Sequence, residues 1–371
     1  MDKLFPVMEV GSLNKAPFRA KDRSKAVAEA RRWGGLLGVE NHEELVKLLE
    51  KESVDDSQMV DWACVYGLRF FESAGLDLVY DGEQRRVEMY EHPLQYVDGF
   101  EFRGVVRVWD NEFYRKAAVI RRPHLLRPYH LDELQFNKRH AKKPLKVPVT
   151  SAYTLADWSF DEYYLKKASG RDLAEKSFSA KRDFVLDLVD QIIHPVLKTL
   201  DNEGVEYLQL DEPAAATKPR ESELVVESIN KAVKGLGSKI AVHICYTDYR
   251  ALFPALLEMK ADVLSISCSN ADTRLPGLEP EKRKGFEILK VFKEYDCRFK
   301  IAPGLVDVHT DFVEPPELVR DRILYSAKML DDPEKVVACN DCGLRTRSWD
   351  IAYRKQLNLA AGASLARKAL E

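Results

Sequence analysis

Short apolar runs alternate along this chain with longer amphipathic stretches, and this alternation limits the folds available to it. The runs are rich in Val, Ile and Leu, and they cover residues 7–12, 76–80, 146–150, 205–210, 240–245, 263–266, 299–306 and 336–339. Such runs are typical of buried parallel strands. The intervening segments carry helical periodicity, as in 184–201, 221–234, 249–259 and 316–330. The pattern predicts an α/β fold, a closed (β/α)8 TIM barrel, with an open doubly wound sheet as the alternative.

Two further segments complete the predicted architecture. Residues 95–125 interrupt the alternation, and we interpret them as a β-hairpin inserted between the second and third barrel strands. Residues 14–62 are expected to be helical. Because barrels of this kind routinely exceed the usual domain size, we expect residues 1–371 to form a single domain. A Gly-x-Gly-x-x-Gly turn follows none of the predicted strands, so a dinucleotide-binding fold has little support.

Composition excludes several classes of function. The formal net charge is -3, with 57 Lys and Arg against 60 Asp and Glu, which indicates neither a nucleic-acid partner nor an anionic membrane surface. No apolar run approaches the roughly 18–20 residues that cross a bilayer. The first residues lack the features of a secretory signal, so we expect a cytoplasmic protein. Six cysteines in so long a chain are better interpreted as buried or metal-binding thiols than as a disulfide scaffold.

Polar side chains close almost every predicted strand. In a parallel barrel the active site lies at the C-terminal ends of the strands. We therefore expect one polar pocket built from Ser12, Asp81 with Glu83, Thr150 with Ser151, Asp211 with Glu212, His243 with Cys245, Ser267 with Cys268, Asp307 with His309, and Cys342.

The pair His243 and Cys245 carries the most specific chemistry. Residues two apart on a strand face the same side, so an imidazole and a thiolate can share one ion. With Cys342 closing the last strand, the donors suit zinc best. A buried histidine beside a buried cysteine is the alternative. Cys339 and Cys342 also have the spacing of a redox pair or a zinc knuckle, but we favour Cys342 as a ligand and Cys339 as a packed residue.

Other strand-end residues are candidates for substrate binding and proton transfer. Asp307 and His309 would share a face, where a carboxylate can orient a general-acid histidine; a hydrogen-bonded structural histidine is the alternative. Glu83 and Asp211 suit the ammonium group of an amino acid, although Asp211 could instead cap a helix. Trp158 could stack on a flat ligand or simply pack.

Together these motifs resemble the C-terminal catalytic barrel of the cobalamin-independent methionine synthase family. The matching segments are Val10-Gly11-Ser12, Asp81-Gly82-Glu83, Asp157-Trp158-Ser159-Phe160, Gln209-Leu210-Asp211-Glu212-Pro213-Ala214, His243-Ile244-Cys245, Pro303-Gly304-Leu305-Val306-Asp307-Val308-His309, and Asp341-Cys342-Gly343-Leu344-Arg345-Thr346-Arg347. The resemblance implies the barrel shared with uroporphyrinogen decarboxylase.

The resemblance also implies roles for individual residues. His243, Cys245 and Cys342 match the zinc ligands of the family. The residues matching its homocysteine site are Gly11, Ser12, Glu83 and Asp211. His309, with Asp307 behind it, matches the residue that protonates the leaving pterin nitrogen, and Trp158 matches the residue that stacks on the folate.

The chain departs from the family pattern in two places. It has room for one barrel where the family's familiar enzyme has two, and this points to a methylcorrinoid protein or another methylpterin as the methyl donor. Ser267 stands where the family has a glutamate ligand, and the adjacent Cys268 could replace that ligand if the strand turns there. Otherwise water or the substrate thiol would complete the coordination.

Three hypotheses follow for the function. The first is zinc-dependent methyl transfer to homocysteine, forming methionine. The second is alkyl or methyl transfer to another thiol such as coenzyme M, whose sulfonate would require Arg or Lys where Glu83 and Asp211 suit an amino acid. The third is a structural zinc protein or a sensor of thiol metabolites.

Overall fold

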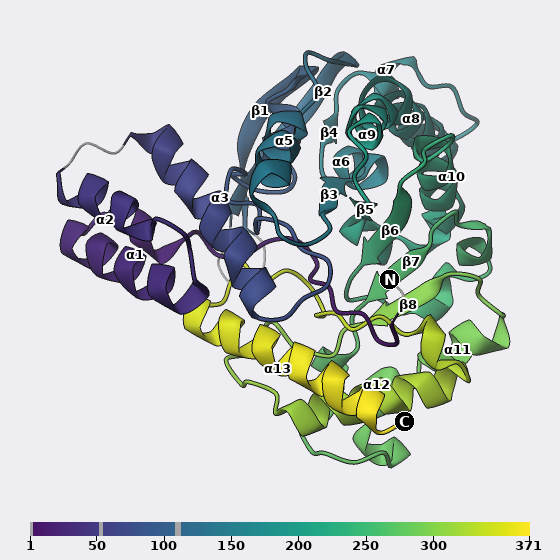
Figure 1. The fold of residues 1–371 in the computed structure, drawn as a ribbon. Helices are drawn as coiled ribbons and strands as arrows, with labels where there is room; N and C mark the ends of the chain where they lie inside the picture. The colour runs from purple at the N-terminus through teal and green to yellow at the C-terminus, as the bar shows by residue number, and fades with distance from the viewer. Residues whose placement is uncertain (1–2, 52–54, 108–112) are drawn as a thin grey trace.

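The computed structural model describes residues 3–51, 55–107 and 113–371, and it shows short parallel strands surrounded by helices (Figure 1). Five strands form one parallel sheet in the order β3-β5-β6-β7-β8. They are β3 (Lys146–Thr150), β5 (Tyr207–Asp211), β6 (Lys239–Ile244), β7 (Val263–Ile266) and β8 (Lys300–Pro303). Each lies within one or two residues of a predicted run, except that β8 stops at Pro303. Proline carries no N–H to continue a ladder.

The three remaining runs, 7–12, 76–80 and 336–339, are not regular strands. They meet their neighbours through single parallel bridges, namely Val7–Ala338, Met8–Leu78, Val79–Leu145 and Ile301–Val336. The ladder is irregular at Val7 because the Val7 N–H donates to the Asp77 carboxylate at 2.9 Å rather than to a carbonyl of a neighbouring strand. The bridges nevertheless connect β8 back to β3, so the parallel strands form a ring.

Helices cover the outside of this ring (Figure 1). They are α1 (Arg23–Leu37), α2 (His42–Glu50), α3 (Asp56–Ser73), α4 (Glu91–Leu94), α5 (Leu131–His140), α6 (Ala152–Asp157), α7 (Tyr164–Lys167), α8 (Leu173–Leu188), α9 (His194–Asn202), α10 (Ser222–Ala232), α11 (Leu289–Glu294), α12 (Pro316–Leu330) and α13 (Trp349–Lys368). Among the described helices, none has both the length and the apolar character needed to cross a membrane.

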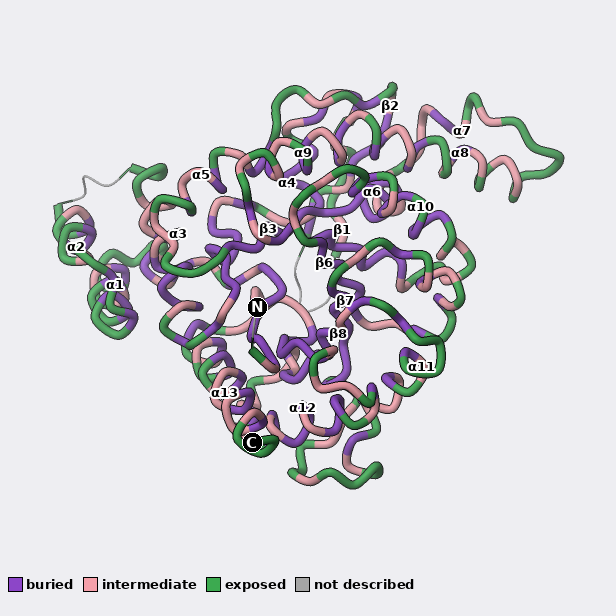
Figure 2. Tube along the Cα trace, turned by 45° about the vertical axis from the view of Figure 1, so that its right-hand side comes forward, coloured by how far each residue is buried: buried purple, intermediate pink, exposed green. Residues whose placement is uncertain are grey.

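Both faces of the sheet are buried (Figure 2). Alternate strand residues such as Leu208 and Val242 belong to the large core shared with the helices. Their neighbours Tyr207 and Ala241 belong to a separate, smaller apolar cluster on the inner face. Burial on both faces explains why the strands read as continuous apolar runs.

The segment predicted as a hairpin contains two long antiparallel strands. β1 (Val97–Arg107) pairs with β2 (Phe113–Leu125) from Val97 opposite Leu125 to Arg107 opposite Phe113. The short β4 (Phe160–Asp161) adds to the other edge of β2. Residues 108–112 of the predicted hairpin lie outside the described residues.

Some of the predicted helices are present in the structure, and one of them is not. The helices expected within 14–62 are present as α1, α2 and the start of α3. The helix expected over 249–259 is wrong: two short 3-10 turns, Tyr249–Leu252 and Ala255–Glu258, replace it. Pro254 lies between them, where it removes a backbone donor and clashes with the preceding turn.

Candidate metal centre and substrate pocket

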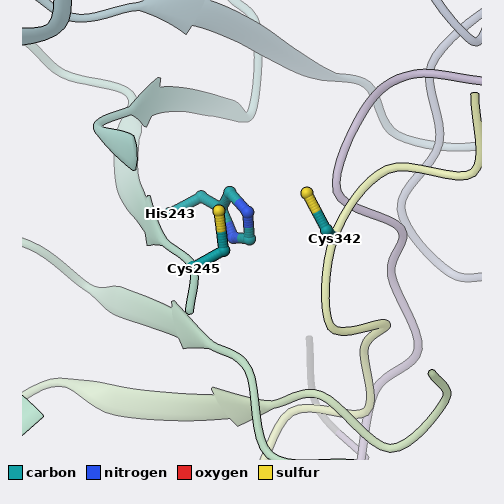
Figure 3. Close-up of side chains that lie close together, drawn as sticks. All are labelled: His243, Cys245 and Cys342. Atoms are coloured by element: carbon teal, nitrogen blue, oxygen red, sulfur yellow. The ribbon is translucent and has the colours of Figure 1, made fainter. Parts of the chain in front are cut away.

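Three potential metal ligands converge at the C-terminal ends of the strands (Figure 3). His243 and Cys245 stand at the end of β6, and Cys342 comes from the loop after residues 336–339. One ligand atom from each lies within 4.8 Å of the others. The Nδ1 atom of His243 lies 3.0 Å from Ser265 Oγ, whereas its Nε2 atom is buried without a hydrogen-bond partner. The hydroxyl therefore fixes the ring and leaves Nε2 available for an ion.

The two thiols of this cluster differ in how readily they ionise. A hydrogen bond between them raises the pKa of Cys245 and lowers that of Cys342, and burial opposes ionisation of both. Zinc bonds of about 2.3 Å to sulfur and about 2.0 Å to nitrogen would place the ligand atoms roughly 3.5 Å apart. Small side-chain movements would therefore form a site for zinc, which prefers this mixture of donors.

The loop that carries Cys342 is anchored by its neighbour Asp341. The Asp341 carboxylate accepts hydrogen bonds from the backbone N–H groups of Cys268, Ser269 and Asn270, at 2.7 to 3.0 Å. Burial raises the pKa of Asp341 to about 7, against the effect of these donors. Gly304 permits the approach, because a Cβ atom there would lie 1.9 Å from Asp341 Oδ1.

Cys268 is not brought into the cluster. Ser265 pairs with His243 in the parallel register, and Ser267, two residues further on, donates to the Asp341 carbonyl at 2.8 Å. The next residue, Cys268, belongs to the apolar core shared with the helices and is only 1% exposed. The group of three possible ligands therefore forms without Cys268.

The cluster opens into a pocket that contains most of the predicted substrate residues. Its lining comprises Val10, Gly11, Ser12, Glu83, Glu88, Met89, Trp158, Asp211, Pro213, His243, Cys245, His309, Cys342, Gly343, Arg345 and Thr346. At its edge, Glu83 adopts a positive φ of 59°, held by a hydrogen bond of 2.8 Å from its N–H to Asp81 Oδ1. A Cβ atom on Gly11 would lie 2.6 Å from Glu83 Oε1, so the glycine gives this carboxylate its room.

Asp211 ends β5 and is oriented from inside the barrel. The Oδ1 atom of Asp211 accepts a hydrogen bond from Gln209 Nε2 at 2.7 Å. The side-chain oxygen of Gln209, Oε1, in turn accepts a hydrogen bond from the Lys146 ammonium group. Burial raises the pKa of Asp211 to about 6, with His243 opposing and Glu83 reinforcing that shift. The sequence analysis missed Gln209 and Lys146 in this role. Two features of the sequence could have indicated this role. They are a lysine in a predicted buried strand and a glutamine two residues before Asp211.

Trp158 and His309 both lie on the wall of the pocket. Trp158 stacks on Tyr114 with ring centroids 5.5 Å apart, so the β2 strand braces it. His309 packs 5.1 Å from the ring of Tyr246. Asp307 accepts from the backbone N–H of His309 at 2.9 Å. Residues 307–310 form a turn rather than a strand, so the argument from strand periodicity was wrong there.

Glu88 and Arg345 are pocket residues that we did not predict. Burial raises the pKa of Glu88 to about 7, although the N–H groups of Glu91 and Tyr90 donate to it. Arg345 donates to the Val87 carbonyl at 2.5 Å. Arg345 belongs to the motif that contains Cys342, so its position in the sequence could have indicated a pocket residue. Glu88 lies outside every motif that we identified.

A ring of parallel strands with a histidine and two cysteines at its C-terminal edge has the arrangement of a barrel enzyme with a candidate metal site. Residues 39–364 match the family model described as the cobalamin-independent synthase catalytic domain. The chain belongs to this family.

Individual relatives agree with this assignment. The methionine synthase of Thermoplasma acidophilum is 41% identical over 298 residues, covering 79% of this chain and 84% of that protein. The methionine synthase of Thermoplasma volcanium is 35% identical over 357 residues, covering 95% and 94%. This chain is thus a methionine synthase-like enzyme.

A solved structure shows the same fold. It is a B12-independent methionine synthase from Shewanella sp. W3-18-1, in complex with selenomethionine. The two structures superpose with a TM-score of 0.75 over 99% of both chains, at 22% sequence identity. The fold is therefore α/β, of the TIM-barrel type.

Proposed function

We propose that this protein is a zinc-dependent methyltransferase that moves a methyl group to the thiol of homocysteine and forms methionine. The observation that carries the proposal is the meeting, in one pocket, of two thiols and an imidazole with the carboxylates of Glu83 and Asp211. The first group suits a metal that activates a thiol, and the second suits the ammonium end of an amino acid.

His243, Cys245 and Cys342 would hold the zinc ion. A coordinating zinc ion lowers the pKa of a thiol, which otherwise stays mostly protonated near neutral pH, and so supplies the thiolate nucleophile. With Cys268 facing the core, these three residues leave one position of a tetrahedral site open for a water molecule or the substrate thiol.

The rest of the pocket would orient the amino-acid part of homocysteine. Glu83 and Asp211 would accept hydrogen bonds from its ammonium group. Ser12, which lines the same wall beside Gly11, would donate to its carboxylate. Because Gln209 occupies Asp211 Oδ1, the other carboxylate oxygen is the one available to the substrate.

Two residues would serve the methyl donor, a methylpterin or a methylcorrinoid protein. Trp158 presents an aromatic face for a flat ring, braced by Tyr114. His309 would protonate the nitrogen of a leaving pterin, and its ring lies in the same pocket as the thiols. Transfer from a methylcorrinoid requires no such acid, so the effect of losing His309 distinguishes the two donors.

We further propose that residues 1–371 act as a single catalytic domain, an eight-stranded barrel with the β1–β2 hairpin inserted after the second strand. The parallel bridges that join 7–12, 76–80 and 336–339 to the five-stranded sheet support this description. The relatives named above are all methionine synthases, and nothing among them supports coenzyme M as the acceptor.

The test is removal of single ligands. We expect His243→Ala and Cys342→Ala to lose zinc and methyl transfer to homocysteine together, with activity falling more than about 100-fold, the upper end of the effect of losing a residue that supports a ligand. Zinc content by mass spectrometry and methionine formation with each donor would be measured on the same preparations.

The matched control is Cys268→Ser, because Cys268 is a buried cysteine near the cluster that does not face it. It should keep both zinc and activity. Full zinc retention with normal turnover in His243→Ala and Cys342→Ala would disprove the proposal.

A further inference from the structure

A second group of metal-ligating side chains lies outside the pocket, at the starts of two helices. His92 lies in α4, and His130 and Glu133 flank the start of α5. One ligand atom from each lies within 4.8 Å of the others, and all three residues are buried. None of them lines the pocket that contains His243.

The two histidine rings of this group stack on each other, and one of them faces the carboxylate. The His92 and His130 rings are parallel to within 4°, with centroids 5.6 Å apart. The His130 side chain is 2% exposed, and its Nδ1 atom faces Glu133 Oε2 at 3.4 Å, which is longer than a good hydrogen bond.

Glu133 supplies the negative charge, and Arg86 orients it. Arg86 Nη2 and Nε donate to Glu133 Oε1 at 2.7 and 3.0 Å. The other oxygen, Oε2, lies 3.4 Å from His130 Nδ1 and accepts a long hydrogen bond from Arg86 Nε at 3.3 Å. A carboxylate has about four lone-pair sites, so Oε2 can bind an ion while Oε1 keeps its arginine. Carboxylates that bind metals are commonly held in this way.

A hollow in the surface reaches the group. Asp56, Tyr96 and Asp132 line it together with the two histidines and Glu133. The hollow provides a path for an ion and room for a water ligand, and its charged lining comprises Asp56, Asp132 and Glu133 together with Arg85. Two imidazoles and one carboxylate with an open position form a ligand set typical of zinc.

We propose that His92, His130 and Glu133 form a second binding site for a divalent transition-metal ion, with zinc the preferred occupant. Bonds of about 2.0 to 2.2 Å require ligand atoms roughly 3.4 Å apart in a tetrahedral site. The three atoms therefore need to close by little more than an ångström. The site has nitrogen and oxygen donors only, which separates it chemically from the thiolate cluster.

This chemical difference makes the test direct. The full-length protein, freed of metal, is titrated with Co²⁺, and bound ions are counted by mass spectrometry. Thiolate ligation gives Co²⁺ a near-ultraviolet charge-transfer band, and nitrogen and oxygen ligands do not. We expect two ions per wild-type chain, with the thiolate band tracking one of them.

Three variants assign the two ions. His92→Ala/His130→Ala should bind one ion and keep the thiolate band, whereas Cys245→Ser/Cys342→Ser should bind one ion without it. Glu133→Gln keeps the size of the side chain and serves if the double histidine variant does not fold; it should weaken the second site at least tenfold. One ion per wild-type chain, or two in both His92→Ala/His130→Ala and Glu133→Gln, would overturn the proposal. Absence of the thiolate band from the wild type would instead refute the zinc site of the proposed function.

Discussion

The polar groups inside the barrel fall into two sets, one at the pocket end and one in a layer further from the pocket. At the pocket end, Glu83, Asp211 and the His243 cluster line the open pocket, and His243 Nε2 is buried without a hydrogen-bond partner. Deeper inside, Glu9, Lys146 and Gln209 are at most 1% exposed and interact mainly with one another: Lys146 donates to Gln209 and lies 4.0 Å from Glu9. The comparison teaches that the ammonium and amide groups of the inner layer are paired within the protein while Glu9 Oε1 is buried without a hydrogen-bond partner, whereas the pocket end is open to ligands.

The largest expected effect is a loss of activity with little loss of stability when a residue at the pocket end is replaced. We expect Cys245→Ser to lower methyl transfer by more than about 100-fold, while the free energy of unfolding of the metal-free protein changes by no more than about 1 kcal/mol. The reason is that the thiol serves an ion rather than the fold. Urea unfolding of metal-free samples and a turnover assay would measure the two. A large stability loss without metal would show that this end also serves the fold, and the contrast would disappear.

The inner layer should show the opposite behaviour. Burial raises the pKa of Glu9 from 4.5 to about 7, with Lys146 opposing and the carboxylates of Glu83, Asp211 and Asp81 reinforcing the shift. The folded state therefore holds a proton that the unfolded chain has already released, so the free energy of unfolding falls as the pH rises from about 4.5 to about 7. Glu9→Gln removes this dependence, which is worth about 3 kcal/mol.

The measurement is the difference in unfolding free energy between Glu9→Gln and wild type. The free energy of unfolding of Glu9→Gln minus that of the wild type should increase by about 3 kcal/mol between pH 4.5 and pH 8. The turnover of the two proteins should be the same at the lower pH. Asp98→Asn, at an exposed ion pair with Arg121, is the control and should not reproduce this trend. Parallel pH profiles for Glu9→Gln and wild type would contradict the assignment.

A smaller effect is expected where the two regions meet. Asp211→Asn keeps the hydrogen bond to Gln209 but removes the charge offered to the ammonium group of homocysteine. A hydrogen bond to a charged group contributes about 1.5 to 3 kcal/mol, so KM for homocysteine should rise roughly 10- to 100-fold. The zinc content should stay unchanged, which distinguishes this residue from the ligands. A KM within twofold of wild type would remove Asp211 from the substrate site.

Local patterns in the sequence predicted a large part of this molecule. Apolar runs marked the strands because both sheet faces are buried, and the spacing of His243 and Cys245 placed them on one side of β6. Those inferences rest on the two-residue repeat of a strand, which holds wherever a ladder is regular. It failed at Asp307 and His309, because β8 ends at Pro303 and a turn follows.

Contacts between distant segments came from the folded chain alone. Cys342 meets Cys245 because Asp341 is anchored on the residues after β7, and Cys268 packs in the apolar core rather than in the cluster. The grouping of His92 with His130 and Glu133 has no counterpart in any local repeat. Side-chain periodicity determines which way a residue faces, but only the packing of strands and loops determines which residues it faces.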